Sequence, residues 1–127
     1  MNFTAKGGAM NTHEAIIAFS QSEKIKSGII WVTNALELFG GLPPQDKPGG
    51  EKIIKMIVGM IAHEVHLAKR LTKDAAWDSV ENPADMAMVM INSGVPQEAS
   101  FHLTQALRQV TNIGQRSMSF LKEKALL

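Results

Sequence analysis

Apolar and small residues between positions 11 and 39 recur at the spacing of one face of an α-helix. Asn11, followed three residues later by Glu14, has the form of a capping box, and no proline interrupts the stretch. We predict a first helix over residues 11–39, about 40 Å long at 1.5 Å per residue. Its predicted core face comprises Ala15, Ala18, Ser22, Ile25, Ile29, Val32, Leu36 and Phe39.

The same helix carries a second apolar stripe on a different side, made of Ile17, Gly28, Trp31, Ala35 and Leu38. This stripe has two interpretations. It packs against another helix of the same chain, or it forms a subunit interface, because a monomer would leave Trp31 and Leu38 half exposed.

Residues 40–50 (GGLPPQDKPGG) interrupt the helical pattern, because glycine ends helices and proline stiffens the connection. We predict a second helix over residues 51–73. At 100° per residue, its apolar residues gather within about 60° of Glu64. They are Ile53, Ile57, Met60, Ile61, Leu67, Ala68 and Leu71. The wheel therefore places Glu64 near the centre of the apolar face, His63 at its edge and His66 pointing away. A carboxylate facing a core is the one local rule that the sequence breaks.

The remaining residues predict two more helices. Residues 74–81 are expected to form a linker in which Trp77 plugs one end of the bundle. Asn82 and Pro83 read as the N-cap and first position of a short third helix, which is rich in methionine and ends at residues 93–94. We expect its methionines to fill the core rather than line a binding groove.

Pro96 is expected to start the last helix, with an apolar face on Ala99, Leu103, Ala106, Leu107, Val110, Ile113, Gly114, Ser117, Leu121 and Ala125. The small residues Gly114 and Ser117 predict a close approach by another helix, and Phe101 points to the opposite side. No segment reads as a strand. The predicted fold is all-α: a four-helix, mostly antiparallel bundle with three long helices and one short one. Residues 1–10 lack periodicity and are predicted to be a disordered leader to a single domain over residues 11–127.

Composition excludes several classes of function. The chain has 127 residues, a net charge of +1 and no cysteine. Without cysteine there is no disulfide, thiol nucleophile or cysteine-based metal site, and a reducing cytoplasm is the expected location. No concentrated basic run suggests a nucleic-acid partner. The longest apolar run, residues 56–62, is too short to span a membrane.

Histidine and glutamate residues supply the candidate chemistry. His63, Glu64 and His102 could meet as one metal site, with Glu98 four residues before His102 to orient it. The alternative interpretation, which we favour, is a set of partly buried side chains satisfied by hydrogen bonds. The HEVH string is not the zinc motif HExxH, because its second histidine comes one residue too early to share a helix face. We therefore expect no metal and no cofactor.

A second candidate chemistry is phosphotransfer. The His66 to Lys69 spacing is similar to that of histidine-containing phosphotransfer domains, in which a nearby cation stabilises the added phosphate. Those domains continue with a small residue where this chain has Arg70. The segment His63–Glu64–Val65 resembles the opening of the phosphoacceptor box of histidine kinases, which continues differently from this chain. These matches are short, and we assign no family on them.

The sequence thus predicts a cytoplasmic helical bundle that acts as a small binding or regulatory protein without catalysis. We expect a homodimer, with Ile17, Trp31, Leu38 and Phe101 as candidate interface residues and a further protein partner as an option. The alternatives are a phosphotransfer-like signalling protein and a bundle with a Glu/His metal site. The residues of that polar or phosphoacceptor site are His63, Glu64, His66, Lys69 and His102.

Overall fold

The computed structural model describes residues 10–127, so the predicted leader lies outside the described residues except for Met10. Within this range the chain forms helices and turns and no strand. The elements are α1 (Thr12–Gly40), α2 (Lys47–Thr72), the 3₁₀ helix η1 (Ala75–Trp77), α3 (Asp78–Asn92), the 3₁₀ helix η2 (Pro96–Glu98) and α4 (Ala99–Glu123). The predicted all-α fold is confirmed.

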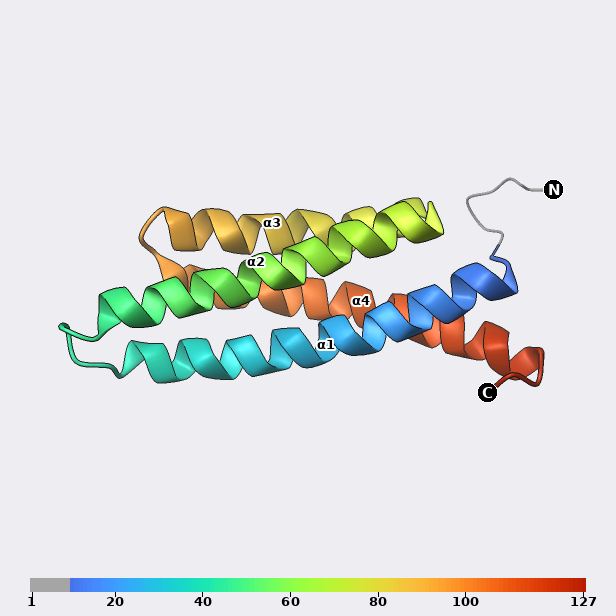
Figure 1. Ribbon diagram of the computed structural model, residues 1–127, viewed down its shortest axis with the longest axis horizontal. Helices are drawn as coiled ribbons and strands as arrows, with labels where there is room; N and C mark the ends of the chain where they lie inside the picture. Colours follow the sequence, from blue (N-terminus) through green and yellow to red (C-terminus); the bar gives the residue numbers. More distant parts are fainter. Residues whose placement is uncertain (1–9) are drawn as a thin grey trace.

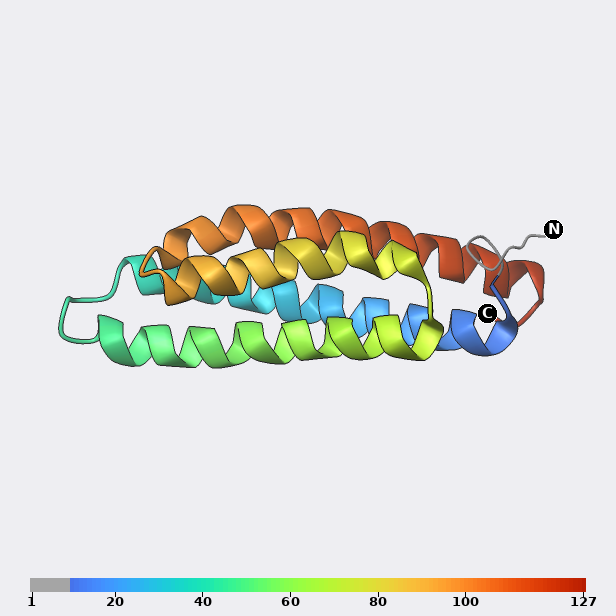
Figure 2. The ribbon, with the colours of Figure 1, turned by 90° about the horizontal axis from the view of Figure 1, so that it is seen from above.

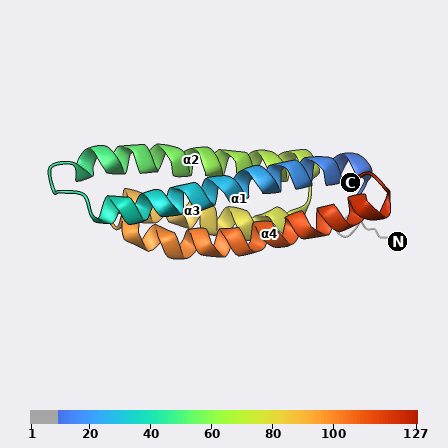
Figure 3. The same ribbon diagram turned by 90° about the horizontal axis from the view of Figure 1, so that it is seen from below.

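The four α-helices form an elongated antiparallel bundle (Figure 1). Helices that follow one another in the chain pack against each other, and α4 also packs against α1, which closes the ring. Figure 2 shows α3 between α2 and α4, and Figure 3 shows α1 between the same two helices on the opposite side. No helix within residues 10–127 combines the length and the apolar character needed to cross a membrane.

Helix α1 begins and packs as the sequence predicts. The backbone N–H of Glu14 donates to the Asn11 side chain at 2.7 Å, and the Glu14 carboxylate accepts from the Asn11 backbone N–H, which completes the capping box. Every residue of the predicted core seam is buried. The predicted seam matches the observed buried face because α1 packs against α2 on one side of it and against α4 on the other.

Helix α2 begins four residues earlier than predicted. Asp46 is its N-cap residue, and Lys47 and Pro48 occupy the first turn, where proline needs no hydrogen-bond partner. Gly50 lies inside the helix, and a Cβ there would sit only 2.8 Å from the Leu42 side chain in the preceding turn. Gly50 therefore lets the turn pack closely onto α2, whereas Gly40 ends α1 as predicted and Gly41 is its C-cap residue.

The predicted core face of α2 is rotated from the observed one. The buried residues are Ile54, Val58, Ile61, Ala62, Val65, Ala68 and Thr72, whereas Ile53, Met56, Met60 and Leu71 are exposed. The helix is apolar around more than half of its circumference, so the wheel alone does not determine which half faces the bundle. As a result Glu64 lies at the edge of the buried face, which corrects the prediction that it occupies the centre.

The predicted linker before the third helix is also corrected. Asp74 accepts a hydrogen bond from the Ala76 N–H and caps η1, which runs directly into α3 at Asp78. Trp77 and Val80 are fully buried, and their burial draws this segment onto the bundle. Pro83 therefore lies inside the helix rather than at its start. Met88 and Met90 pack against the core, whereas Met86 is exposed.

Helix α4 follows the predicted face, with one exception at its end. Ala125 lies beyond the helix, is exposed and has a φ of 60°, so it is not a core residue. The predicted close approach occurs at Gly114, where a Cβ would lie 3.1 Å from the Cβ of Ser22 on α1. Leu107 is partly buried against the core.

Candidate functional site

Glu64 joins α2 to α1. Its carboxylate accepts hydrogen bonds from Gln21 Nε2 at 3.0 Å and from Lys24 Nζ at 3.1 Å, and its backbone oxygen accepts a second bond from Gln21. The side chain is 27% exposed. The hydrogen bond from Gln21, followed by that from Lys24, lowers the pKa of Glu64 below its usual value of 4.5. A carboxylate with this pKa is ionised at neutral pH and poorly suited to act as a general base.

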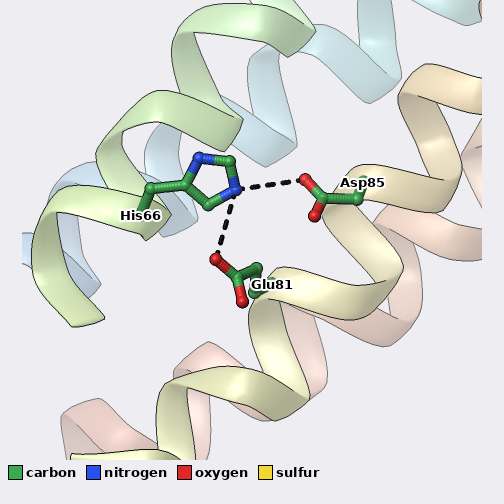
Figure 4. Close-up of side chains that lie close together, drawn as sticks. All are labelled: His66, Glu81 and Asp85. Atoms are coloured by element: carbon green, nitrogen blue, oxygen red, sulfur yellow. Dashed lines mark hydrogen bonds and ion pairs between the residues drawn. The ribbon is translucent and has the colours of Figure 1, made fainter. Parts of the chain in front are cut away.

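The largest gathering of ligand-type side chains lies on the other side of α2, where it faces α3. His66 Nε2 lies 3.2 Å from Asp85 Oδ1 and 3.3 Å from Glu81 Oε2 (Figure 4). The ligand atoms of these three residues all lie within 4.8 Å of one another. We call His66, Glu81 and Asp85 the His66 cluster. Among residues 10–127 it is the one grouping of three or more such side chains close enough to share a metal ion.

Lys69, one turn after His66, binds the same acidic surface. Its ammonium lies 2.7 Å from Asp78 Oδ1 and 3.0 Å from Glu81 Oε1. The hydrogen bond to Asp78, followed by that to Glu81, raises the pKa of Lys69 above its usual value of 10.5. The two carboxylate oxygens of Glu81 are thus divided between Lys69 and His66.

The acidic partners come from α3 because of where that helix starts. Asp78, Glu81 and Asp85 are spaced three and four residues apart, so they share one face once the helix begins at Asp78. His66 and Lys69 are likewise three residues apart on α2. The predicted linker over residues 74–81 left Glu81 outside the third helix, so the shared face of Glu81 and Asp85 was not predicted. The signal that could have found them is an acidic i, i+3, i+7 pattern beside a basic i, i+3 pair.

The other predicted site residues lie apart from one another. His63 is exposed and lines an open pocket of ≈ 390 Å³ with His66 and Asp85. Glu64 faces α1 instead, and the ring of His102 on α4 contacts that of Phe101 edge to face. The structure therefore unites His63, His66 and Lys69 beside α3, and it does not bring together the proposed Glu64, His63 and His102 metal site.

This geometry is poorly suited to phosphotransfer through His66. A phosphoryl group on Nε2 would carry about two negative charges at neutral pH into contact with Asp85 and Glu81. The cation that the resemblance provides, Lys69, is already bound to two carboxylates. The surface around His66 favours a cation over an anion.

A pocket of ≈ 890 Å³ lies at the end of the bundle where α1 turns into α2. Lys47, Lys52 and Lys55 line it together with Glu51. The Lys47 ammonium binds the backbone oxygens of Phe39 and Gly40, where it caps the C-terminus of α1. Apart from these charged side chains, few polar groups line the pocket that could bind a ligand together.

The candidate interface residues differ in exposure. Trp31 and Leu38 are 71% and 72% exposed, Phe101 is also exposed, and Ile17 is half-buried.

Comparison of the chain with protein-family models, with curated proteins and with solved structures finds no significant match.

Proposed function

We propose that this protein is a small binding protein that acts through an exposed apolar surface on α1 and α2, and that the primary occupant of this surface is a second copy of the chain. We call the surface the α1–α2 face. It comprises Trp31, Leu38, Ile53, Met56 and Met60, each more than half exposed. The single observation that carries the proposal is the exposure of Trp31 beside these residues.

The two halves of the face are adjacent across the seam between the helices. A Cβ at Gly28 on α1 would lie 3.2 Å from Ile61 on α2. Trp31 is one turn after Gly28, and Met60 is one turn before Glu64, whose carboxylate also lies in the seam. Because α1 and α2 are antiparallel and Gly28 lies opposite Ile61, Trp31 lies about one turn along the bundle from the level of Met60. Both side chains are exposed.

The charge on this face is internally balanced. Lys24 and Glu64, which cross the seam, neutralise each other at 3.1 Å. An apolar surface without net charge offers little to attract a charged partner, and it can meet its own copy about a two-fold axis without repulsion.

The outer surface of α1 and α2, whose apolar part is the α1–α2 face, is large enough for a dimer interface. Two helices of about 40 Å, packed roughly 10 Å apart, present an outer surface of about 800 Å². This is the contribution of one partner to a standard protein–protein interface, about 800 Å². Large exposed apolar patches on small proteins commonly mark interaction sites.

Light scattering and sedimentation at micromolar concentration test the proposal. The wild-type chain is expected to give twice its mass of 13.8 kDa. Trp31→Glu and Leu38→Glu are each expected to weaken dimerisation by at least about 30-fold, because they place a charge in the centre of the interface. Their helical circular dichroism should match that of the wild type.

Phe101→Glu is the matched control, because Phe101 is an exposed aromatic residue on α4, which is diagonally opposite α2 in the ring. We expect this variant to remain a dimer. A wild-type monomer at micromolar concentration contradicts the proposal. A dimer disrupted by Phe101→Glu but not by Trp31→Glu assigns the interface to α4 and also contradicts it.

A further inference from the structure

The surface around the His66 cluster carries more negative than positive charge. It holds three carboxylates and one ammonium: Lys69 contacts Asp78 and Glu81, and Asp85 contacts His66. With a neutral imidazole at His66, two negative charges lack a cationic partner within this group. A divalent cation beside His66 would neutralise both of them.

Two of the three separations between the ligand atoms match those of a metal-bound set. Bonds of about 2.0–2.2 Å to nitrogen and oxygen place neighbouring ligand atoms of a tetrahedral ion about 3.3 Å apart. His66 Nε2 lies 3.3 Å from Glu81 Oε2 and 3.2 Å from Asp85 Oδ1. The oxygens of Glu81 and Asp85 lie within 4.8 Å of each other, and side-chain rotations that bring them closer would let the three atoms surround one ion (Figure 4).

Lys69 orients one of these ligands. It binds Glu81 through Oε1 at 3.0 Å and leaves Oε2 facing His66. Hydrogen-bonded outer partners of this kind fix the direction of metal-ligating carboxylates. Asp85 is one turn after Glu81 on α3, so both carboxylates approach the imidazole from the same rigid helix.

We propose that the His66 cluster binds a divalent first-row transition-metal ion, for which Zn²⁺ is the probe. One imidazole nitrogen and two carboxylate oxygens suit this class of ion, whereas Ca²⁺ and Mg²⁺ prefer oxygen ligands alone. Without an ion, Nε2 donates its proton to these carboxylates, so coordination through Nε2 requires that this proton move to Nδ1 or be released to solvent. The ion links α2 to α3.

The site retains an open coordination position. Three protein ligands leave the fourth tetrahedral position for water or a small anion, as in exchangeable metal sites. The pocket beside His66 and Asp85 has room for this ligand, and it is also lined by His63 and Asn92. His63 is not required for binding in this proposal.

Calorimetric titration of the full chain with Zn²⁺, after treatment with a chelator, tests the proposal. One ion per chain is expected to bind with micromolar or tighter affinity. His66→Ala, Glu81→Gln and Asp85→Asn should each weaken binding by about 10–100-fold. Co²⁺ should give the visible absorption of a tetrahedral site, and His66→Ala should abolish that absorption.

His102→Ala is the matched control, because His102 is a partly exposed histidine on α4, away from the cluster. It should bind Zn²⁺ as the wild type does. Thermal unfolding provides an independent measurement, since Zn²⁺ at about 100 times Kd should raise Tm by roughly 5–15 °C in the wild type and not in His66→Ala. Binding only at millimolar Zn²⁺, or equal weakening by His66→Ala and His102→Ala, overturns the proposal.

Discussion

Gln21 Nε2 donates to both the carboxylate and the backbone oxygen of Glu64, at 3.0 and 3.2 Å. This pair ties the middle of α2 to α1, and Lys24 adds a cationic contact to the same carboxylate. Glu64 thus links two helices at the edge of the buried face, where its charge is satisfied by donors. It is not an isolated charge in an apolar core.

Replacing Glu64 with leucine should destabilise the fold. Gln21 is buried, and in Glu64→Leu its side-chain amide loses the carboxylate acceptor and keeps only the backbone oxygen of residue 64. We expect a loss of about 1 kcal/mol in the free energy of unfolding. Glu64→Gln keeps a side-chain acceptor and should cost less than about 0.5 kcal/mol. Urea denaturation at neutral pH measures both values, and a leucine variant as stable as the wild type contradicts this interpretation.

The contribution of Glu64 should depend on pH. Its folded-state pKa lies below 4.5, chiefly because of the hydrogen bond from Gln21, so the unfolded chain binds this proton more readily. The stabilisation is present above the unfolded pKa and is lost as the pH falls through the lower, folded pKa. The difference in unfolding free energy between the wild type and Glu64→Gln should therefore narrow below about pH 4.5. A difference that stays constant from neutral pH into acid would contradict the assignment.

Two glycine-to-alanine substitutions should have opposite effects. Gly49 lies in α2 with open space where a Cβ would be, so Gly49→Ala should be neutral or stabilise by up to about 1 kcal/mol. Gly114→Ala gains the same helix propensity, but its new Cβ meets the buried Ser22 at 3.1 Å. Because Ser22 is fixed on α1, relief requires the helices to separate, and we expect a net loss of roughly 1 kcal/mol. Urea midpoints of the two variants give the comparison. Equal stability of the two variants would show that α1 and α4 have room to move.

The two tryptophans should report separately on folding and association. Trp77 is fully buried, whereas Trp31 lies on the α1–α2 face. In Trp31→Phe, the remaining fluorescence should resist acrylamide until the chain unfolds. The wild type should show an additional quenchable component at nanomolar concentration, which becomes protected at micromolar concentration as the dimer forms. A component that is quenched equally at both concentrations contradicts the burial of Trp31 by a second chain.

The first helix could be predicted from the sequence almost completely. Its apolar seam from Ala15 to Phe39 faces both α2 and α4, so the seam is the buried face. Its capping box depends only on residues close together in the sequence. The fold class followed from the same periodicity. The last helix was predicted equally well up to Ala125, where a left-handed backbone ends the pattern.

The candidate site could be predicted only in part. His63, His66 and Lys69 were identified, but their partners on α3 were not, because the start of that helix depends on the burial of Trp77 and Val80. The burial of these two side chains depends on the packing of the whole bundle, so the pattern of residues 74–81 alone does not predict it.

The sequence by itself determined the number of helices, the first core face and the polar residues available for chemistry, since these depend on contacts within a few turns. The tertiary structure alone decided the rotation of α2, and with it the place of Glu64 at a seam and of His66 opposite Asp85. A helix that is apolar on more than half of its surface packs on whichever side removes the most apolar area from water. That choice belongs to all four helices together.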